Sequence, residues 1–304
     1  MDLLAAFRTF IRISETGSFS AVAREVGATQ PAISRQIAAL EEHLGCRLLQ
    51  RSTRSLRLTE DGIDLLAHAR EVVDAVEQAE AALGRRRSSP AGTVRLGSPA
   101  VFGRLYIAPH IGQLLRRYPE LSVDLLLTDD VVDMVQEGLD LSIRVGPVGD
   151  AALVARRVGS TTALAVAAPE YLAAHGEPAH PAELATHECI IFTRTPDPGL
   201  WIFNGADGEV PVAVSGRLRC NNIEAVMTAA VGGLGVALLP TWMLHEDLGA
   251  GRLVALLRGW QPPRRPISIV YPSRRFLAPR TRVVIDFLVD EFRLDPAISA
   301  SADG

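Results

Sequence analysis

The side chains with the clearest potential for chemistry lie close together near the N-terminus. They are Gln30, Ser34, Arg35 and Gln36. The apolar residues between and after them recur at helical spacing, which leaves these four polar side chains on the opposite, solvated face. An Arg guanidinium can donate two hydrogen bonds to guanine, and a Gln amide can pair with adenine in a similar way. The stretch therefore has the side chains that base recognition in the major groove requires.

Two short helices with a tight bend are predicted to position these groups. Ser18 is placed to cap the first helix, and Gly27 to end it in the left-handed conformation that glycine adopts readily. Thr29 is placed to cap the second helix, and Pro31 fits its first turn, where a missing N–H costs nothing. Such a pair predicts a helix-turn-helix, whose second helix reads the major groove. A plain helical hairpin with solvated polar residues is the alternative that this motif leaves open.

A basic segment follows the two helices. After a glycine helix stop, a turn between two short apolar runs predicts a two-stranded wing, of the kind that lies against phosphates. Its arginines are Arg47, Arg51, Arg54 and Arg57. Residues 1–58 hold eight Arg and five acidic residues, a charge of +3, whereas residues 59–89 carry −3 and the remainder −4. The positive excess thus coincides with the predicted DNA-binding segment, although a solvated basic hairpin would look the same.

A long helix is predicted to begin after Thr59, its N-cap, with two acidic residues at its positive end. Apolar or small residues alternate at spacings of three and four, which is typical of a coiled-coil seam. The seam residues are Leu66, Ala69, Val73, Val76 and Leu83. We expect this helix to pair two chains, since a two-fold protein suits a two-fold DNA site. A helix packed on its own domain is the alternative.

From residue 93 onward, strand and helix patterns alternate, which predicts an α/β domain with a mainly parallel sheet. Residues 131–138 are predicted to form a short helix. The strands are too numerous for one small sheet, so we expect two α/β subdomains. The predicted domains are a DNA-binding domain (1–59), a linker helix with hinge (60–90), an effector domain (91–297) and a disordered tail (298–304). Subdomain I comprises 91–160 and 267–297, and subdomain II comprises 161–266.

The composition excludes several other classes of protein. At 48% hydrophobic and 22% charged residues, the chain is ordinary for a globular protein. We find no signal peptide and no run of about 18 apolar residues, so we expect a cytoplasmic protein without a membrane span. There is no Gly-x-Ser-x-Gly elbow, no phosphate-binding loop and no His-Glu-x-x-His motif. We therefore expect no catalytic activity, no cofactor and no metal site.

Two sets of motifs stand at the spacing of a known family. The first comprises TQPAIS at 29–34, Leu44-Gly45 and LTEDG at 58–62, and the second comprises LRRYPELSVDLLL and GLGVALLP. With these motifs the chain resembles the LysR-type transcriptional regulators, and the similarity extends over nearly the whole chain. The resemblance implies a winged helix-turn-helix and an effector domain similar to periplasmic binding proteins. It also implies a homodimer or homotetramer, an interrupted inverted repeat in double-stranded DNA, and contact with RNA polymerase.

The resemblance also implies site residues. The DNA-contacting positions it gives are Gln30, Pro31, Ser34, Arg35 and Arg54, to which the sequence pattern adds Ser18, Thr29, Gln36 and Arg51. The effector is expected between the subdomains, at strand carboxyl ends and helix amino ends, where unpaired N–H groups suit anions. The expected residues on one side are Ser98, Ala100, Val101, Phe102, Thr128, Arg144, Val145 and Gly146, and on the other Phe192, Cys220, Asn221 and Pro240.

The expected effector is a small organic acid. The hydroxyls of Ser98 and Thr128 could bind a carboxylate, while the apolar Val101 and Phe102 favour an aromatic or hydrophobic acid over a simple dicarboxylate. Each of these residues could instead serve as a cap, a turn or a structural ion pair. Redox sensing through Cys189 and Cys220 is an alternative mode of regulation. An enzyme or a solute-binding protein is the remote alternative.

Overall fold

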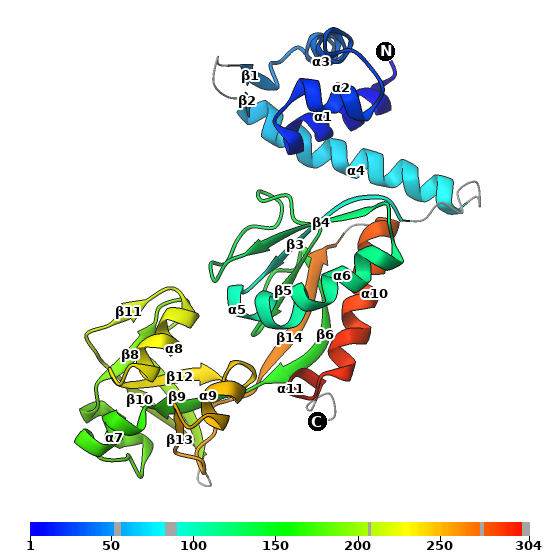
Figure 1. Cartoon of the computed structure of the whole chain (residues 1–304). Helices are drawn as coiled ribbons and strands as arrows, with labels where there is room; N and C mark the ends of the chain where they lie inside the picture. The colour runs from blue at the N-terminus through cyan, green and yellow to red at the C-terminus, as the bar shows by residue number, and fades with distance from the viewer. Residues whose placement is uncertain (52–55, 83–89, 206–207, 274–276, 300–304) are drawn as a thin grey trace. The chain divides into compact units, whose positions relative to one another are not determined.

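The computed structural model describes residues 1–51, 56–82, 90–205, 208–273 and 277–299 (Figure 1). Contacts divide the chain into two compact units. The N-terminal unit consists mainly of Met1–Ser89, and the C-terminal unit mainly of Pro90–Met134, Leu139–Ser273 and Val283–Gly304. Among the described residues, no helix has the length and apolar character that crossing a membrane requires.

The N-terminal unit has three helices, a wing and a long helix, in the order predicted. Its elements are α1 (Leu3–Thr16), α2 (Phe19–Glu25), α3 (Gln30–Leu44), β1 (Leu49–Arg51), β2 (Leu56–Leu58) and α4 (Glu60–Ala82). The wing strands pair antiparallel. The Ser52–Ser55 turn of the predicted wing lies outside the described residues.

Most of the predicted helix caps are confirmed. Ser18 Oγ accepts a hydrogen bond from the N–H of Ala21 at 3.2 Å, and Thr59 Oγ1 accepts one from the N–H of Gly62 at 2.9 Å. The prediction that the Thr29 side chain caps α3 was wrong, because its hydroxyl makes no hydrogen bond to the helix. A threonine cap needs a free N–H in the first turn. Here one position is Pro31, and the N–H of Ala32 already bonds to the Thr29 carbonyl at 2.9 Å.

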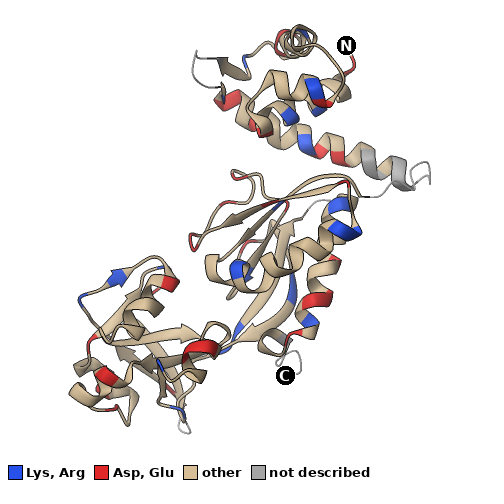
Figure 2. Cartoon of the chain, viewed as in Figure 1, with Lys and Arg blue, Asp and Glu red and all other residues tan. Residues whose placement is uncertain are grey.

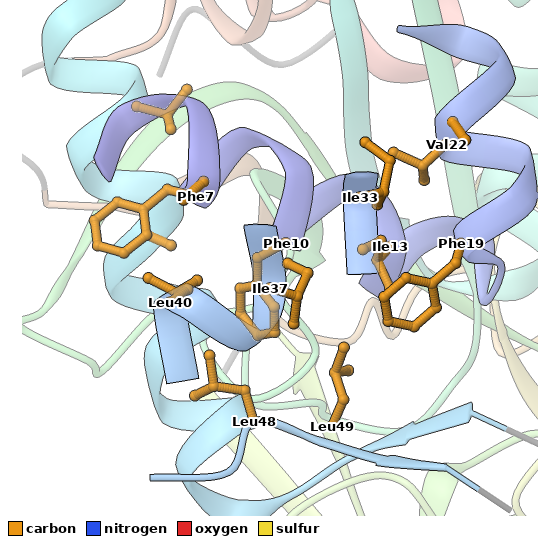
Figure 3. Packing of buried hydrophobic residues seen from close by; sticks show 14 residues of the cluster. Phe7, Phe10, Ile13, Phe19, Val22, Ile33, Ile37, Leu40, Leu48 and Leu49 are labelled. Carbon is orange, nitrogen blue, oxygen red and sulfur yellow. The ribbon is translucent and has the colours of Figure 1, made fainter. Parts of the chain in front are cut away.

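The core of the N-terminal unit draws on every element of that unit (Figure 3). Phe10 of α1 is fully buried, and it lies beside Ile37 of α3. Each such side chain stabilises the fold by about 1.5–3 kcal/mol. Ala69 and Val73 of α4 are buried in the same core, and α4 packs on α1. These two members of the predicted coiled-coil seam therefore contact their own chain, because the domain needs α4 to close its core.

The C-terminal unit contains two five-stranded sheets, which define two lobes (Figure 1). The sheet of lobe I has the order β4-β3-β5-β14-β6. Its strands are β3 (Gly92–Ser98), β4 (Leu121–Leu127), β5 (Leu141–Val145), β6 (Leu153–Thr161) and β14 (Arg265–Pro272). The helices of lobe I are α5 (Ala100–Phe102), a π-helical turn (Gly103–Ile107), α6 (Ala108–Arg117), α10 (Pro279–Leu294) and α11 (Pro296–Ser299).

The sheet of lobe II has the order β11-β8-β12-β7-β13. Its strands are β7 (Ala163–Ala167), β8 (Cys189–Phe192), β11 (Arg219–Cys220), β12 (Val236–Pro240) and β13 (Val254–Leu256), and a separate hairpin joins β9 (Leu200–Gly205) to β10 (Gly208–Ala213). The helices are α7 (Pro169–His175), α8 (Ile223–Val231) and α9 (His245–Gly249), with short 3-10 turns at Pro181–Thr186 and Thr241–Met243.

The chain passes between the lobes at one place. It leaves lobe I after Thr161, at the end of β6, and re-enters at Arg265, at the start of β14. These two residues are register partners, because β6 and β14 pair antiparallel along their whole length. The two connecting strands therefore cross between the lobes side by side.

Two local expectations were wrong. Residues 131–133 are irregular and residues 134–138 form turns, instead of the predicted helix. The Val132 carbonyl accepts a hydrogen bond from the Arg144 guanidinium at 2.7 Å, and Gly138 has φ +61°. Neither feature suits the interior of a helix. The tail predicted at 298–304 begins inside α11, where Ile298 is fully buried against Gly159, while 300–304 lie outside the described residues.

Candidate functional site

The outward face of α3 carries the first candidate site. Its apolar face is buried in the core, whereas Gln30, Pro31 and Arg35 are exposed and Ser34 is half-buried. Within the described residues, the Arg35 guanidinium has no hydrogen-bond or ion-pair partner. The helix thus presents an amide and a guanidinium within five residues of its start, on a rigid scaffold. This arrangement can donate hydrogen bonds to base edges.

Two residues predicted to contact DNA make hydrogen bonds inside the chain. Gln36 Oε1 accepts a hydrogen bond from Thr9 Oγ1 of α1 at 3.0 Å. Thr9 is buried, so this bond satisfies a hydroxyl that has lost its water. The Ser18 hydroxyl likewise has a partner inside the chain, because it caps α2 by accepting a hydrogen bond from the Ala21 N–H. The sequence pattern placed Gln36 on the outer face because helical spacing does not show which neighbouring helix overlaps that face.

The wing adds basic groups beside this face. Arg57 of β2 is exposed, and the exposed Arg47 forms an ion pair at 3.2 Å with Glu41, whose side chain is largely buried. Arg51 belongs to β1, and Arg54 lies outside the described residues. Acidic residues begin α4 (Figure 2), where their charge meets the positive end of the helix.

The second candidate site begins at one edge of the lobe I sheet. Because β3 is parallel to both β4 and β5, the carboxyl ends of the three strands lie at the same edge. This brings Ser98, Thr128 and Arg144 together. Thr128 N donates to Ser98 O at 3.0 Å, and the Thr128 hydroxyl accepts from the N–H of Asp130 at 3.1 Å. Burial lowers the pKa of Arg144, whose guanidinium donates to the Val132 carbonyl.

The aromatic residue predicted to line the effector site is enclosed. Phe102 is fully buried, and its ring centroid lies 5.1 Å from Tyr106, 5.4 Å from Trp242 and 5.6 Å from Phe292. Val101 is buried as well. The Tyr106 hydroxyl donates to the Trp242 carbonyl at 2.7 Å, and burial raises the pKa of Tyr106 to about 12. The side chain of Phe102 therefore contributes to packing between α5, α10 and the turn after β12.

The remaining residues predicted in lobe I are backbone groups of the same edge. Val145 is half-buried, and Gly146 has φ +116° with its N–H donated to Pro266 at 2.8 Å. The Ala100 N–H donates to the carboxylate of Asp129 at 3.0 Å. Ala100 therefore already binds a carboxylate, which belongs to the chain itself.

The matching edge belongs to the lobe II sheet. Because β8 is parallel to β11 and β12, Phe192, Cys220 and Pro240 lie at its carboxyl edge, with the exposed Asn221 directly after them. Cys220 and Phe192 are register partners. Cys189, at the other end of β8, is fully buried, and burial raises the pKa of its thiol to about 12.

The two edges are linked by residues that sequence reasoning missed. Asp129 of lobe I accepts hydrogen bonds from the Ile223 N–H at 3.0 Å and from Asn222 Nδ2 at 3.4 Å, both at the start of α8 in lobe II. Asn222 Oδ1 caps α8 by accepting from the Ala225 N–H at 2.9 Å. Asp129 follows the predicted residue Thr128, and Asn222 follows the predicted residue Asn221. The sequence therefore located the two loops but not the side chains that make the contact. Two exposed ion pairs flank this link, Arg194–Asp130 and Arg104–Glu224.

Comparisons with protein families match both units. Residues 4–63 match the model of the bacterial regulatory helix-turn-helix protein, lysR family. Residues 87–293 match the LysR substrate binding domain.

Individual proteins are similar over nearly their full length. The chain is 32% identical to the HTH-type transcriptional regulator DmlR of Escherichia coli, over 96% of this chain and 95% of that protein. It is 32% identical to the HTH-type transcriptional regulator PtxR of Pseudomonas aeruginosa, over 94% and 92%. Among solved structures, CrgA from Neisseria meningitidis is 30% identical with a TM-score of 0.62, covering 95% of this chain and 98% of that one. The virulence activator AphB of Vibrio cholerae is 28% identical with a TM-score of 0.60, covering 95% and 99%.

Proposed function

The chain belongs to the LysR-type family of transcriptional regulators, and on this premise we propose that it regulates transcription in response to a small organic or aromatic acid. Its relatives are regulators and not enzymes. In this proposal α3 reads an interrupted inverted repeat in double-stranded DNA. The acid binds in the C-terminal unit, between the carboxyl edges of the two sheets.

The DNA-reading role is supported by the division of α3 into two faces. Ile33, Ile37 and Leu40 are buried, so the helix cannot turn its other face away from solvent. Arg35 on that face is free to grip a guanine, and Gln30 to pair with an adenine. Basic residues of the wing would contact phosphates and supply affinity without base preference.

A symmetric site requires two copies of α3, so the proposal includes a homodimer or homotetramer. The predicted seam of α4 is partly used inside the chain, but Ile63 and Val72 of α4 remain exposed, at 50% and 44%. Apolar side chains on an otherwise charged helix are the kind of contact that a second copy would cover. RNA polymerase would be the further partner through which occupancy of the site affects transcription.

Arg144 is the single observation that carries the choice of an acidic effector. Its guanidinium is half-buried, and among the described residues its one hydrogen-bond partner is a neutral carbonyl oxygen. A cation that has lost water without gaining a negative partner favours an anion nearby. The hydroxyls of Ser98 and Thr128 end neighbouring strands at the same edge. Signalling then requires that the acid bind one arrangement of the two lobes more tightly than another.

A thermal-shift screen of the reduced full-length protein against aromatic and aliphatic carboxylates tests the effector class. A ligand at a hundred times its Kd adds about 2.7 kcal/mol to the free energy of unfolding. We expect Arg144→Gln to abolish this gain. The matched control is Arg95→Gln, which removes an arginine of the same sheet that pairs with the exposed Asp124. The proposal is supported by a carboxylate that changes the DNA affinity of wild type and that stabilises both wild type and Arg95→Gln. If the same carboxylate also stabilises Arg144→Gln, the role assigned to Arg144 is contradicted.

A further inference from the structure

The carboxylate of Asp129 binds backbone and side-chain donors of both lobes. Its Oδ1 accepts a hydrogen bond from the Ala100 N–H at 3.0 Å, in lobe I. Its Oδ2 accepts from the Ile223 N–H at 3.0 Å and from Asn222 Nδ2 at 3.4 Å, in lobe II. One side chain therefore divides its two oxygens between the two lobes, and Asp129 itself is half-buried.

The donors on lobe II suit a negative charge. Ile223 is the first residue of α8, a helix of nine residues, and its N–H has no carbonyl partner within the helix. The positive end of the helix favours an anion there. Hydrogen bonds from N–H groups to a carboxylate are about twice as strong as those between neutral groups. Asp129 thus occupies the position that would otherwise be open to a carboxylate from solution.

The other polar links between the lobes lack this combination of features. The Tyr106 hydroxyl of lobe I donates to the Trp242 carbonyl of lobe II at 2.7 Å, but this bond joins two neutral groups. The ion pairs Arg104–Glu224 and Arg194–Asp130 join the lobes on either side of Asp129, but their side chains are 41–52% exposed. Exposed ion pairs contribute little, because water and salt screen them. Among the described contacts at this edge, the link through Asp129 combines charge, partial burial and backbone donors. It is therefore the contact on which closure of this edge depends most.

We propose that Asp129 is a built-in latch, which holds lobe I against α8 in the effector-free sensor and which an acidic effector replaces. This inference rests on the proposed function insofar as it assumes an acidic effector. Exchange of one carboxylate for another leaves the charge at α8 unchanged. It releases the loop after β4 from lobe II, so the arrangement of the lobes comes to depend on the effector's own contacts.

Hydrogen exchange at the start of α8 tests the latch in the full-length protein. In wild type, the Ile223 N–H is protected through its bond to Asp129. We expect Asp129→Ala to accelerate exchange of this amide at least tenfold, which corresponds to about 1.4 kcal/mol. Glu224→Gln is the matched control, because it removes an exposed link between the same two lobes and leaves the Asp129 bonds intact. It should leave the exchange rate of Ile223 unchanged.

Formate is the probe for the vacated position. Titrated into Asp129→Ala, it should restore the protection of Ile223 in a saturable way, whereas sodium chloride of equal ionic strength should not. Wild type, whose position is filled, should not respond to formate. Unchanged exchange in Asp129→Ala would overturn the latch. If Asp129→Ala accelerates hydrogen exchange and formate fails to restore the protection of Ile223, the idea that an effector carboxylate replaces Asp129 would be overturned.

The measurement uses neither DNA nor a natural effector. Should no carboxylate alter DNA binding by wild type, the proposed effector class fails while the latch result stands. If formate slows hydrogen exchange at Ile223 in Glu224→Gln as much as in Asp129→Ala, its action is general and the specific latch is excluded.

Discussion

Arg35→Ala should change which DNA sequence the protein prefers without changing how stably it folds. The Arg35 side chain is exposed on α3, and within the described residues it has no partner to lose. Exposed substitutions of this kind usually alter the free energy of unfolding by no more than about 0.5 kcal/mol. The effect should therefore appear in binding alone.

The size of that effect follows from the chemistry of the guanidinium. A bidentate contact to guanine discriminates against the wrong base by about 1–3 kcal/mol. Since about 1.4 kcal/mol is tenfold, Arg35→Ala should lower the preference at one base position by roughly 5- to 150-fold. The slope of affinity against salt should change little, because that slope counts contacts to phosphates.

Selection from a randomised half-site, followed by fluorescence anisotropy at two salt concentrations, measures both quantities. Gln36→Ala is the internal comparison, because its amide accepts from the buried Thr9. It should cost about 1 kcal/mol of unfolding free energy and leave base preference unchanged. The reasoning is refuted if Arg35→Ala retains the wild-type preference, or if Gln36→Ala relaxes it without loss of stability.

Three further predictions concern the C-terminal unit. Burial raises the pKa of Cys189 to about 12, so at neutral pH its thiolate is about a thousandfold scarcer than that of an ordinary thiol; iodoacetamide should label it only after unfolding, and peptide mass spectrometry showing rapid labelling of the folded protein would contradict this. Ile298→Ala should lower the unfolding free energy by about 2–5 kcal/mol, since Ile298 is fully buried; an unchanged urea midpoint would mean that α11 is not docked in solution. Phe102→Ala should cost about 3–5 kcal/mol in the same assay, because the ring is enclosed by three other aromatic rings; a loss of effector response at full stability would instead assign Phe102 to the effector site.

Features encoded by neighbouring residues were predictable from the sequence. The capping serine at 18, the left-handed glycine at 27 (φ +66°) and the threonine cap at 59 all appear as expected. Each depends on residues within a few positions of one another, so a local pattern carries the whole signal.

Features set by distant parts of the chain were not predictable. The helical pattern at 131–138 does not show that Arg144 of β5 binds the Val132 carbonyl. Gln36 has an outward position on α3, but α1 supplies its partner. The sequence pattern did not single out Asp129, because its donors lie 29 and 94 residues away in the chain. The redox alternative weakens for the same reason, since the burial of Cys189 is a property of the folded lobe.

The paired crossing of β6 and β14 limits how the two lobes can move. Two separate connections would let the lobes slide, stretch apart or swivel independently. Here Thr161 and Arg265 are register partners in a ladder that is interrupted by one shift of register, between Ile267 and Ser268, so lengthening one connection would break hydrogen bonds to the other. The low-energy motion that remains is a bend or twist of one ribbon about a single line. A change of contacts at the carboxyl edges of the sheets would then alter the angle between the lobes. The distance between the lobes at the crossing would change little.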